Sequence, residues 1–144
     1  MKAAAASTGR IMGRVPQGED LLGYLNQVCL AEDIRAGQVS AIGAVAKARI
    51  GFYDQAKQEY GFMDLDEPME IVALMGNVSL KDGKPFVHAH VVLGGHDGKL
   101  LGGHLSEGAP VFACEFIITK FSSDQEFVRG LDQGTGLPLW QGLS

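Results

Sequence analysis

The sequence has few cysteines and no long apolar run, and each shortage removes a class of protein. No apolar segment approaches the roughly 20 residues that a membrane-spanning helix needs. The N-terminal MKAAAASTG is too short and too weakly apolar to predict a secretory signal. The two cysteines, Cys29 and Cys114, lie inside apolar patterns typical of small core residues. We therefore expect a protein of the reducing cytoplasm.

Basic residues are too few to predict binding to DNA by this chain alone. Lys and Arg number 12 against 17 Asp and Glu, so the formal net charge is −5. Phosphate contacts supply much of the affinity of a DNA-binding protein, which normally presents a basic face. A basic patch formed in an oligomer is the remaining route to nucleic acid. Phosphate loops, Cys-x-x-Cys pairs and local nucleophile motifs are missing as well.

What the sequence contains is one globular domain, residues 1–144, rich in strands. Hydrophobic residues make up 46% of the chain, and its 20 glycines lie mostly between apolar runs. Residues 11–15 predict a first strand. Residues 19–35 predict a helix that packs on a sheet through an apolar stripe of Leu21, Leu22, Leu25, Val28 and Cys29.

Strand patterns follow from residue 38 to the neighbourhood of residue 121. Gly43 marks a bulge or a close backbone approach in the segment 39–54. The segments 71–75 and 111–118 are apolar at successive positions, so both of their faces need cover. One helix can cover only one face, and we infer a homo-oligomer. The competing interpretation is a sheet curled into a barrel. The tail from Arg129 is broken by Gly and Pro, and Trp140 is its expected anchor to the body.

All four histidines lie between residues 88 and 104. His88 and His90 are two apart on a predicted strand and therefore share a face. If residues 96–98 form a three-residue loop with Gly98 in the left-handed region, His90 lies directly opposite His104. A two-residue turn, or bulges at the nearby Gly-Gly pairs, would change this register and could send His104 to the other face.

Three converging imidazoles predict a metal site formed by His88, His90 and His104. Neutral imidazole suits zinc and related divalent transition metals, and three such ligands leave an open position for water or an anionic ligand. The competing interpretation is a His-x-His pair that points to solvent. His96, at the turn, is expected to be a solvated loop residue. Glu115 is a candidate partner of the metal site, or else a sheet-edge or intersubunit ion-pair residue.

A family resemblance rests on longer motifs. The segments GRVPQGEDLLGYL, GNVSLKDGKPFVHAHVVLGGHDGKLLGGHL, CEFIITKF and LDQGTGLPLW resemble the PPC domain (plants and prokaryotes conserved) over about residues 8–140. The resemblance implies an α+β fold, a mostly antiparallel sheet with one main helix, assembled as a homotrimer. It also implies metal binding through the histidines at 88, 90 and 104. Plant members carry AT-hook segments with Arg-Gly-Arg-Pro cores, and this sequence has none.

Our first hypothesis is a small cytoplasmic homotrimer with one zinc-type site per subunit that binds or transforms a small ligand. Whether the ion is catalytic or structural is left open at this point. The alternative is a DNA-associated regulatory or interaction module without catalysis. A third hypothesis is an oligomerisation domain that holds no metal.

Overall fold

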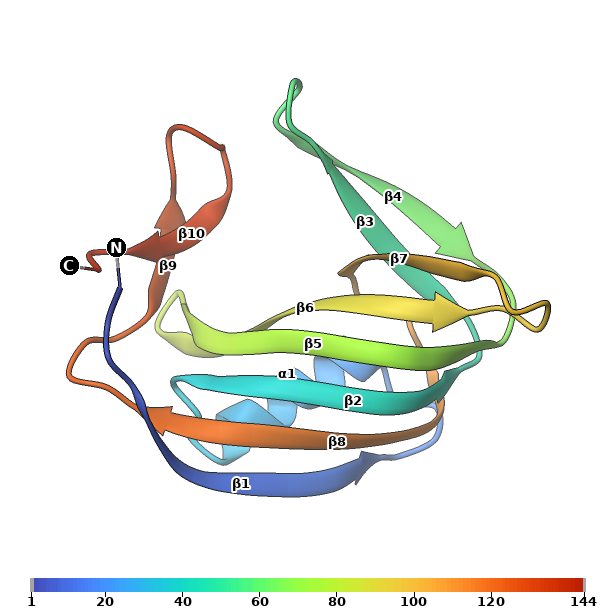
Figure 1. Ribbon diagram of the computed structural model, residues 1–144, viewed down its shortest axis with the longest axis horizontal. Helices are drawn as coiled ribbons and strands as arrows, with labels where there is room; N and C mark the ends of the chain where they lie inside the picture. The colour runs from blue at the N-terminus through green and yellow to red at the C-terminus, as the bar shows by residue number, and fades with distance from the viewer. Residues whose placement is uncertain (1, 144) are drawn as a thin grey trace.

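Helix α1 (Leu21–Ala31) lies against one face of a large sheet in the computed structural model, which describes residues 2–143 (Figure 1). Within these residues the sheet has ten strands, in the order β1-β8-β2-β5-β6-β7-β3-β4 with the β9–β10 hairpin attached beside β5. Neighbouring strands are antiparallel except for the single β5–β9 bridge. The strands are β1 (Ala6–Val15), β2 (Gly37–Val45), β3 (Ala48–Asp54), β4 (Glu59–Leu65), β5 (Met69–Lys81), β6 (Lys84–Gly94), β7 (Leu100–Leu105), β8 (Val111–Ser122), β9 (Val128–Leu131) and β10 (Pro138–Gln141). The expected mostly antiparallel sheet with one helix is confirmed.

The ends of two predicted elements were wrong. Strand β1 starts at Ala6, earlier than the predicted 11–15. Helix α1 is shorter than the predicted 19–35, because Asp20 is its N-cap and accepts a hydrogen bond from the Gly23 N–H at 2.9 Å. At the other end Asp33 takes φ +47, which ends the helical path. With 11 residues, α1 is far too short to cross a bilayer, and residues 2–143 contain no helix that could.

Gly43 produces both features that its position predicted. The β2–β5 register shifts between Ala41 and Gly43, which is a bulge. Gly43 has φ +150, and a Cβ there would stand 2.1 Å from the carbonyl oxygen of Ala113 on β8. A side chain at this position would collide with the neighbouring backbone, so glycine is required for β2 and β8 to pair.

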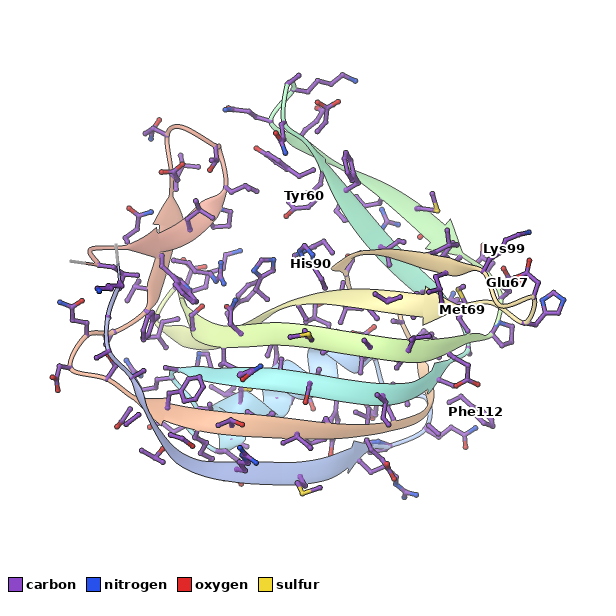
Figure 2. All side chains as sticks on the ribbon, in the orientation of Figure 1. Tyr60, Glu67, Met69, His90, Lys99 and Phe112 are labelled. Carbon is purple, nitrogen blue, oxygen red and sulfur yellow. The ribbon has the colours of Figure 1, made fainter. Side chains whose placement is uncertain are left out.

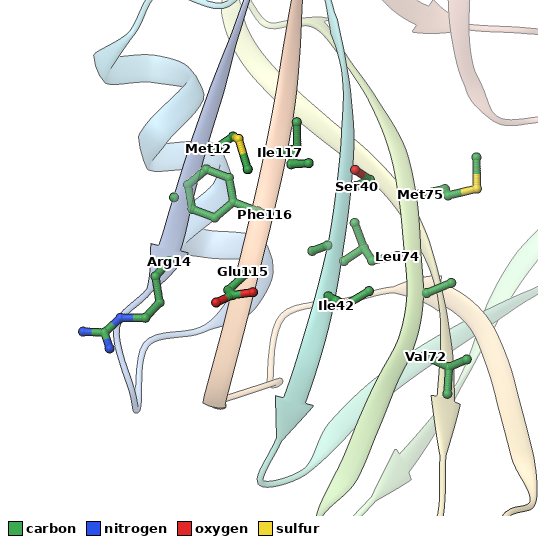
Figure 3. A pocket seen from close by; sticks show the side chains of 13 residues that line it. Met12, Arg14, Ser40, Ile42, Val72, Leu74, Met75, Glu115, Phe116 and Ile117 are labelled. Carbon is green, nitrogen blue, oxygen red and sulfur yellow. The ribbon is translucent and has the colours of Figure 1, made fainter.

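The two faces of the sheet differ in cover. Side chains such as Leu74, Val91 and Ile118 are buried on the face that carries α1. On the opposite face, here called the outer face, Ile42 is 59% exposed and Met75 63% exposed. Figure 3 shows the apolar groove on this face, lined by side chains that include Met12, Ile42, Val72, Met75, Ile117, Arg14 and Glu115.

The barrel interpretation was wrong. Among residues 2–143, β1 and β4 lie at the two ends of the strand order and do not pair with each other. The sheet therefore stays open, and its outer face is not enclosed by the chain itself.

Two hairpins rise from the sheet above β6 and β7 (Figure 1), and side chains of one reach the backbone of the other. One is β3–β4 and the other β9–β10. The hydroxyl of Tyr53 donates to the carbonyl of Thr135 at 2.7 Å, and the amide of Gln58 donates to the carbonyl of Gly134 at 3.2 Å. The ring of Trp140 packs against that of Phe127, directly before β9, with the ring centroids 5.0 Å apart. The hairpins therefore flank the strands that carry the histidines.

Candidate metal centre

The β6–β7 turn sets the position of the third histidine. The Gly95 N–H donates to the Lys99 carbonyl at 2.9 Å, and Gly98 takes φ +79. This is the three-residue loop with a left-handed glycine that the sequence predicted. It sets a register in which His90 pairs with His104 across the two strands. The alternative two-residue turn is not found, and the three histidines share one face.

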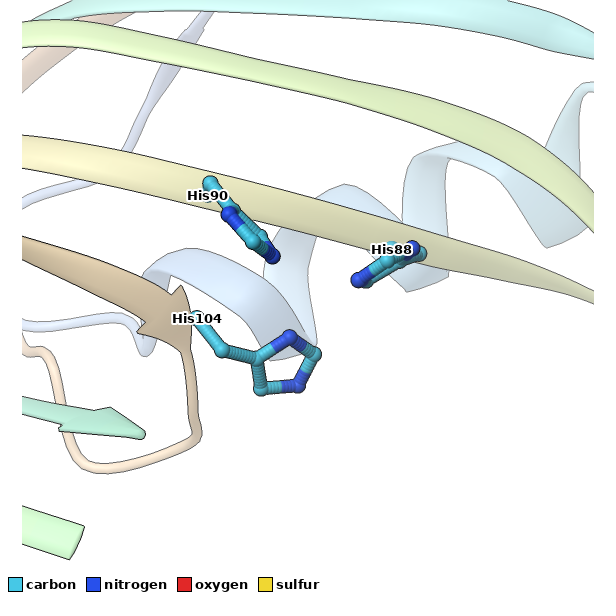
Figure 4. Close-up of side chains that lie close together, drawn as sticks. All are labelled: His88, His90 and His104. Atoms are coloured by element: carbon cyan, nitrogen blue, oxygen red, sulfur yellow. The ribbon is translucent and has the colours of Figure 1, made fainter. Parts of the chain in front are cut away.

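The three imidazoles converge on one point. The ring centroids of His88 and His90 are 5.3 Å apart, those of His88 and His104 5.0 Å, and those of His90 and His104 5.7 Å. One nitrogen from each ring lies within 4.8 Å of the others. Figure 4 shows a nitrogen of each ring facing the space between them. The interpretation of His88 and His90 as a solvent-facing pair is therefore replaced by a cluster.

The cluster belongs to the outer face of the sheet. Met75 pairs with His90 and Asn77 with His88, so these residues share a face. Between the two histidines Ala89 points to the other side and is buried against the core. From α1, the side chain of Asn26 accepts the Val87 N–H at 2.8 Å, which ties the helix to β6 directly before His88. The strand that carries His88 and His90 is therefore held in place by the core and by α1 on its opposite face.

Partial burial keeps the imidazoles of His88 and His104 neutral. Burial lowers the pKa of His88 to about 4, with Arg129 and the other two histidines adding to the effect. Burial, His90 and Arg129 also lower the pKa of His104. A metal ion binds the neutral form of imidazole, so at neutral pH these rings are already in the ligating state.

Arg129, on β9, borders the cluster. Its Nη2 lies 3.4 Å from Nδ1 of His88 and donates to Oδ1 of Asn77 at 2.7 Å. Its Nε donates to Oγ of Ser79 at 2.9 Å, and its Nη1 donates to the carbonyl of Pro138 at 2.9 Å. Arg129 was missed in the sequence because it lies 41 residues from His88 and has no local motif. Only the return of β9 to the side of β5 brings it here.

Tyr60, on β4, borders the opposite side of the cluster and was also missed. Its ring lies 5.0 Å from the ring of His104 and 5.1 Å from that of Tyr53. Burial raises the pKa of Tyr60, the nearby Tyr53 adds to the rise, and the positive charge of Arg129 opposes it. In Figure 2, Tyr60 and His90 lie in the region between the two hairpins.

The donor set fits a divalent transition metal. The Nδ1 atom of His104 is buried and has no hydrogen-bond partner within residues 2–143, which is unusual for a buried polar atom. A metal ion would satisfy it. His88, His90 and His104 supply three neutral nitrogen donors, the set that zinc uses when one position stays open. Bound there, such an ion acts as a Lewis acid and lowers the pKa of a bound water.

The other two sequence candidates lie elsewhere. His96 is exposed at the β6–β7 turn, as expected for a solvated loop residue. Of the two interpretations of Glu115, the one that made it a partner of the metal site was wrong. It lies on β8, which β2 and β5 separate from β6, and it lines the apolar groove. The pattern of an acidic residue in an apolar strand does not show which other strands lie beside that strand.

The chain resembles known proteins over nearly all of its length. The model of the Plants and Prokaryotes Conserved domain matches residues 3–122. The Bifunctional protein GlmU of Synechococcus sp. (strain JA-3-3Ab) is 32% identical over 124 residues, which are 85% of this chain and 19% of that protein. The chain therefore spans about a fifth of the length of this curated relative.

Solved structures of similar proteins superpose closely. A metal-containing protein from Archaeoglobus fulgidus is 44% identical with a TM-score of 0.93, over 99% of this chain and 100% of that one. A plant- and prokaryote-conserved protein from Pyrococcus horikoshii is 37% identical with a TM-score of 0.93, over 100% and 99%. A protein suggested to bind DNA, from Ralstonia eutropha JMP134, is 26% identical with a TM-score of 0.82, over 92% and 90%. Together with the match of the family model, these likenesses establish that the chain belongs to the Plants and Prokaryotes Conserved domain family.

Proposed function

We propose that this protein binds one divalent transition-metal ion per chain, zinc being the representative case, through His88, His90 and His104. The observation that carries the proposal is the convergence of one nitrogen from each ring within 4.8 Å. The relative from Archaeoglobus fulgidus, described as metal-containing and 44% identical, supports it. The lowered pKa of His88 adds support, because protons then compete weakly with the metal.

The proposed activity at this centre is the binding of a small ligand. Three protein ligands leave a coordination position of a tetrahedral ion open. His90 is exposed, so a small molecule can approach the cluster from solvent. The chain's own residues keep the imidazoles of His88 and His104 neutral, and the strand pairing orients all three rings.

Metal analysis tests the proposal. Protein loaded with zinc and then dialysed should retain one ion per chain by elemental analysis. His88→Ala should lose it, because two imidazoles hold zinc far more weakly than three. His96→Ala is the matched control, since it removes the fourth histidine at the exposed turn, and it should retain the ion. Full metal in His88→Ala would overturn the assignment of the site to these histidines. No metal in the wild type would overturn the proposal and leave the oligomerisation-domain hypothesis.

We further propose that the protein is a homotrimer whose subunits associate through the outer face. The apolar groove on this face supports the proposal, because such large exposed apolar side chains gathered on one face mark contact surfaces. The number three rests on the family resemblance. The measurement is the molar mass in solution, and a monomer at micromolar concentration would contradict association.

The proposed location is the reducing cytoplasm. Cys29 and Cys114 are both buried and unpaired. Burial raises the pKa of Cys29 to about 12, and burial together with Glu115 raises that of Cys114 to about 11, so both thiols stay protonated. Free structural thiols of this kind are typical of proteins in reducing compartments.

The alternative function is that of a DNA-associated module without catalysis. The relative from Ralstonia eutropha favours it by its description. The net charge of −5 opposes it, because DNA affinity depends on neutralising phosphates. Electrophoretic mobility shifts at low salt decide the matter. Absence of any shift there would remove the alternative.

A further inference from the structure

Arg129, beside the three histidines, carries a positive charge that no Asp or Glu of the described residues neutralises. The cluster consists of three imidazoles, and among the described residues no Asp or Glu belongs to it. Arg129 forms no ion pair with any Asp or Glu within residues 2–143, although it is partly buried. A bound divalent cation would add two further positive charges. Uncompensated charge of this size in a partly buried site favours an anion from solution.

Arg129 is held in place and still has hydrogen-bonding capacity. Its four hydrogen-bonding contacts are Ser79, Asn77, the Pro138 carbonyl and Nδ1 of His88, and all of these groups are uncharged. The guanidinium also lies 5.7 Å from the ring centroid of Phe86 and 5.9 Å from that of Trp140. A guanidinium has five N–H groups, so one has no acceptor among the described residues. The group is therefore oriented before any ligand arrives.

Metal binding would release another of these N–H groups. In the metal-free chain Nδ1 of His88 faces the guanidinium, which can only donate, so this contact favours the tautomer whose Nδ1 accepts and whose Nε2 carries the proton. Nε2 is the nitrogen that remains for a metal, and an imidazole that ligates through it carries its proton on Nδ1. A proton there faces an N–H of Arg129, and two donors cannot bond each other. The metal-bound centre therefore leaves Arg129 in need of an acceptor.

Tyr60 offers a second donor on the far side of the cluster. Its ring lies tilted beside that of His104, and its hydroxyl makes no hydrogen bond within residues 2–143. Arg129 borders the same cluster through its contact with His88. Both groups border the histidine cluster from hairpins that meet at the Tyr53–Thr135 contact.

We propose that the ligand of this centre is a small oxyanion, a carboxylate or a phosphoryl group, recognised by Arg129 with help from the Tyr60 hydroxyl. This inference rests on the proposed metal-binding function. Arg129 binds the oxyanion through its positive charge and its directed N–H groups. A guanidinium fits both a carboxylate and a phosphoryl group in this way. Neutral ligands of the metal gain nothing from Arg129.

Cobalt-substituted protein tests the inference, because its visible absorption reports both the metal and any new ligand. Cobalt-loaded wild type is titrated with inorganic phosphate, with acetate and with imidazole as a neutral ligand. Arg129→Gln should bind the effective oxyanion at least about tenfold more weakly, the loss expected for a hydrogen bond to a charged group. Its affinity for imidazole should stay within about twofold. Phosphate and acetate are separate arms that distinguish the two oxyanion classes.

Matched variants separate recognition from folding. Tyr60→Phe keeps the ring beside His104, and we expect it to weaken oxyanion binding by about threefold to tenfold, in the range of one neutral hydrogen bond. Arg35→Gln makes the same charge change at an exposed arginine paired with Glu126, and it should match the wild type. If Arg129→Gln does not fold, the wild-type titrations still test whether the centre binds phosphate or acetate as well as imidazole.

The outcomes separate the two proposals. A chain that takes up no cobalt overturns the metal-binding function. A chain whose cobalt spectrum responds to imidazole but to neither phosphate nor acetate keeps the metal function and overturns the oxyanion inference. Equal oxyanion affinity in wild type and Arg129→Gln also overturns it.

Discussion

His90 on β6 lies directly opposite His104 on β7, and this pairing brings the third imidazole to the other two. The pairing depends on a loop of only three residues. Gly98 at its end takes φ +79, a conformation that other residues adopt at a cost. The geometry of a turn at the far end of the hairpin thus decides whether a metal centre exists.

Gly98→Ala should lower the free energy of unfolding by about 1 kcal/mol, the cost of the left-handed region for a residue with a Cβ. No atom lies within 4 Å of the added Cβ, so strain is the cause. Urea denaturation measures the change. Gly61→Ala on β4 is the control, because its Cβ would meet a single atom at 3.9 Å and its φ is not in the positive range. It should be neutral or slightly stabilising, and an equal loss in both variants would contradict the strain argument.

The stability of the metal-free protein should fall as pH drops from about 6.5 towards 4. His88 has its ordinary pKa of 6.5 in the unfolded chain and a pKa of about 4 in the fold, chiefly because of burial. Between these values the unfolded state binds more protons, so acid favours unfolding. The contribution of neutral His88 is therefore complete above pH 6.5 and lost as pH falls through 4.

Urea denaturation in the presence of a chelator, at pH 7, 5.5 and 4, measures this dependence. His88→Gln removes the titrating group, so its stability should change less over the same interval. Carboxylates titrate in both proteins, and the difference between them isolates His88. Parallel pH profiles for the two proteins would show that His88 does not contribute.

Asp20→Ala should destabilise the fold by about 2 kcal/mol, because one carboxylate satisfies three backbone donors. Asp20 accepts from the Gly23 N–H at the start of α1, from the Gly108 N–H at 2.7 Å and from the Ala109 N–H at 2.9 Å. It therefore joins the helix to the segment between β7 and β8. Thermal or urea unfolding measures the loss. Glu19→Ala, at the exposed neighbouring position, should change stability by less than about 0.5 kcal/mol.

Ile42→Glu should dissociate the proposed trimer without unfolding its subunits. Ile42 is 59% exposed on the outer face and lines the groove, so a charge there opposes association and leaves the core intact. Leu30→Glu on α1 is the control, at 58% exposure and outside the groove. Light scattering coupled to size exclusion should give a monomer mass for Ile42→Glu and an unchanged mass for Leu30→Glu. A trimer mass for both would place the interface elsewhere.

Local patterns were sufficient to predict much of the fold and the histidine cluster. The apolar stripe of α1 follows from helical spacing, and four of its members are buried. The face shared by His88 and His90 follows from the two-residue period of a strand. The pairing of His90 with His104 could be counted from one glycine loop, because the strands that carry them are neighbours in sequence.

Relationships between distant segments were decided by the tertiary structure. Glu115 lies only 11 positions from His104 in sequence, yet two strands separate β8 from β6 because the chain crosses over to pair β8 between β1 and β2. Arg129 reaches His88 because the β9–β10 hairpin returns beside β5. The sequence by itself determined which residues can ligate a metal and how a local turn aligns them. Which side chains surround them depends on strand order, and strand order is set by packing of the whole chain, a long-range effect that no local pattern encodes.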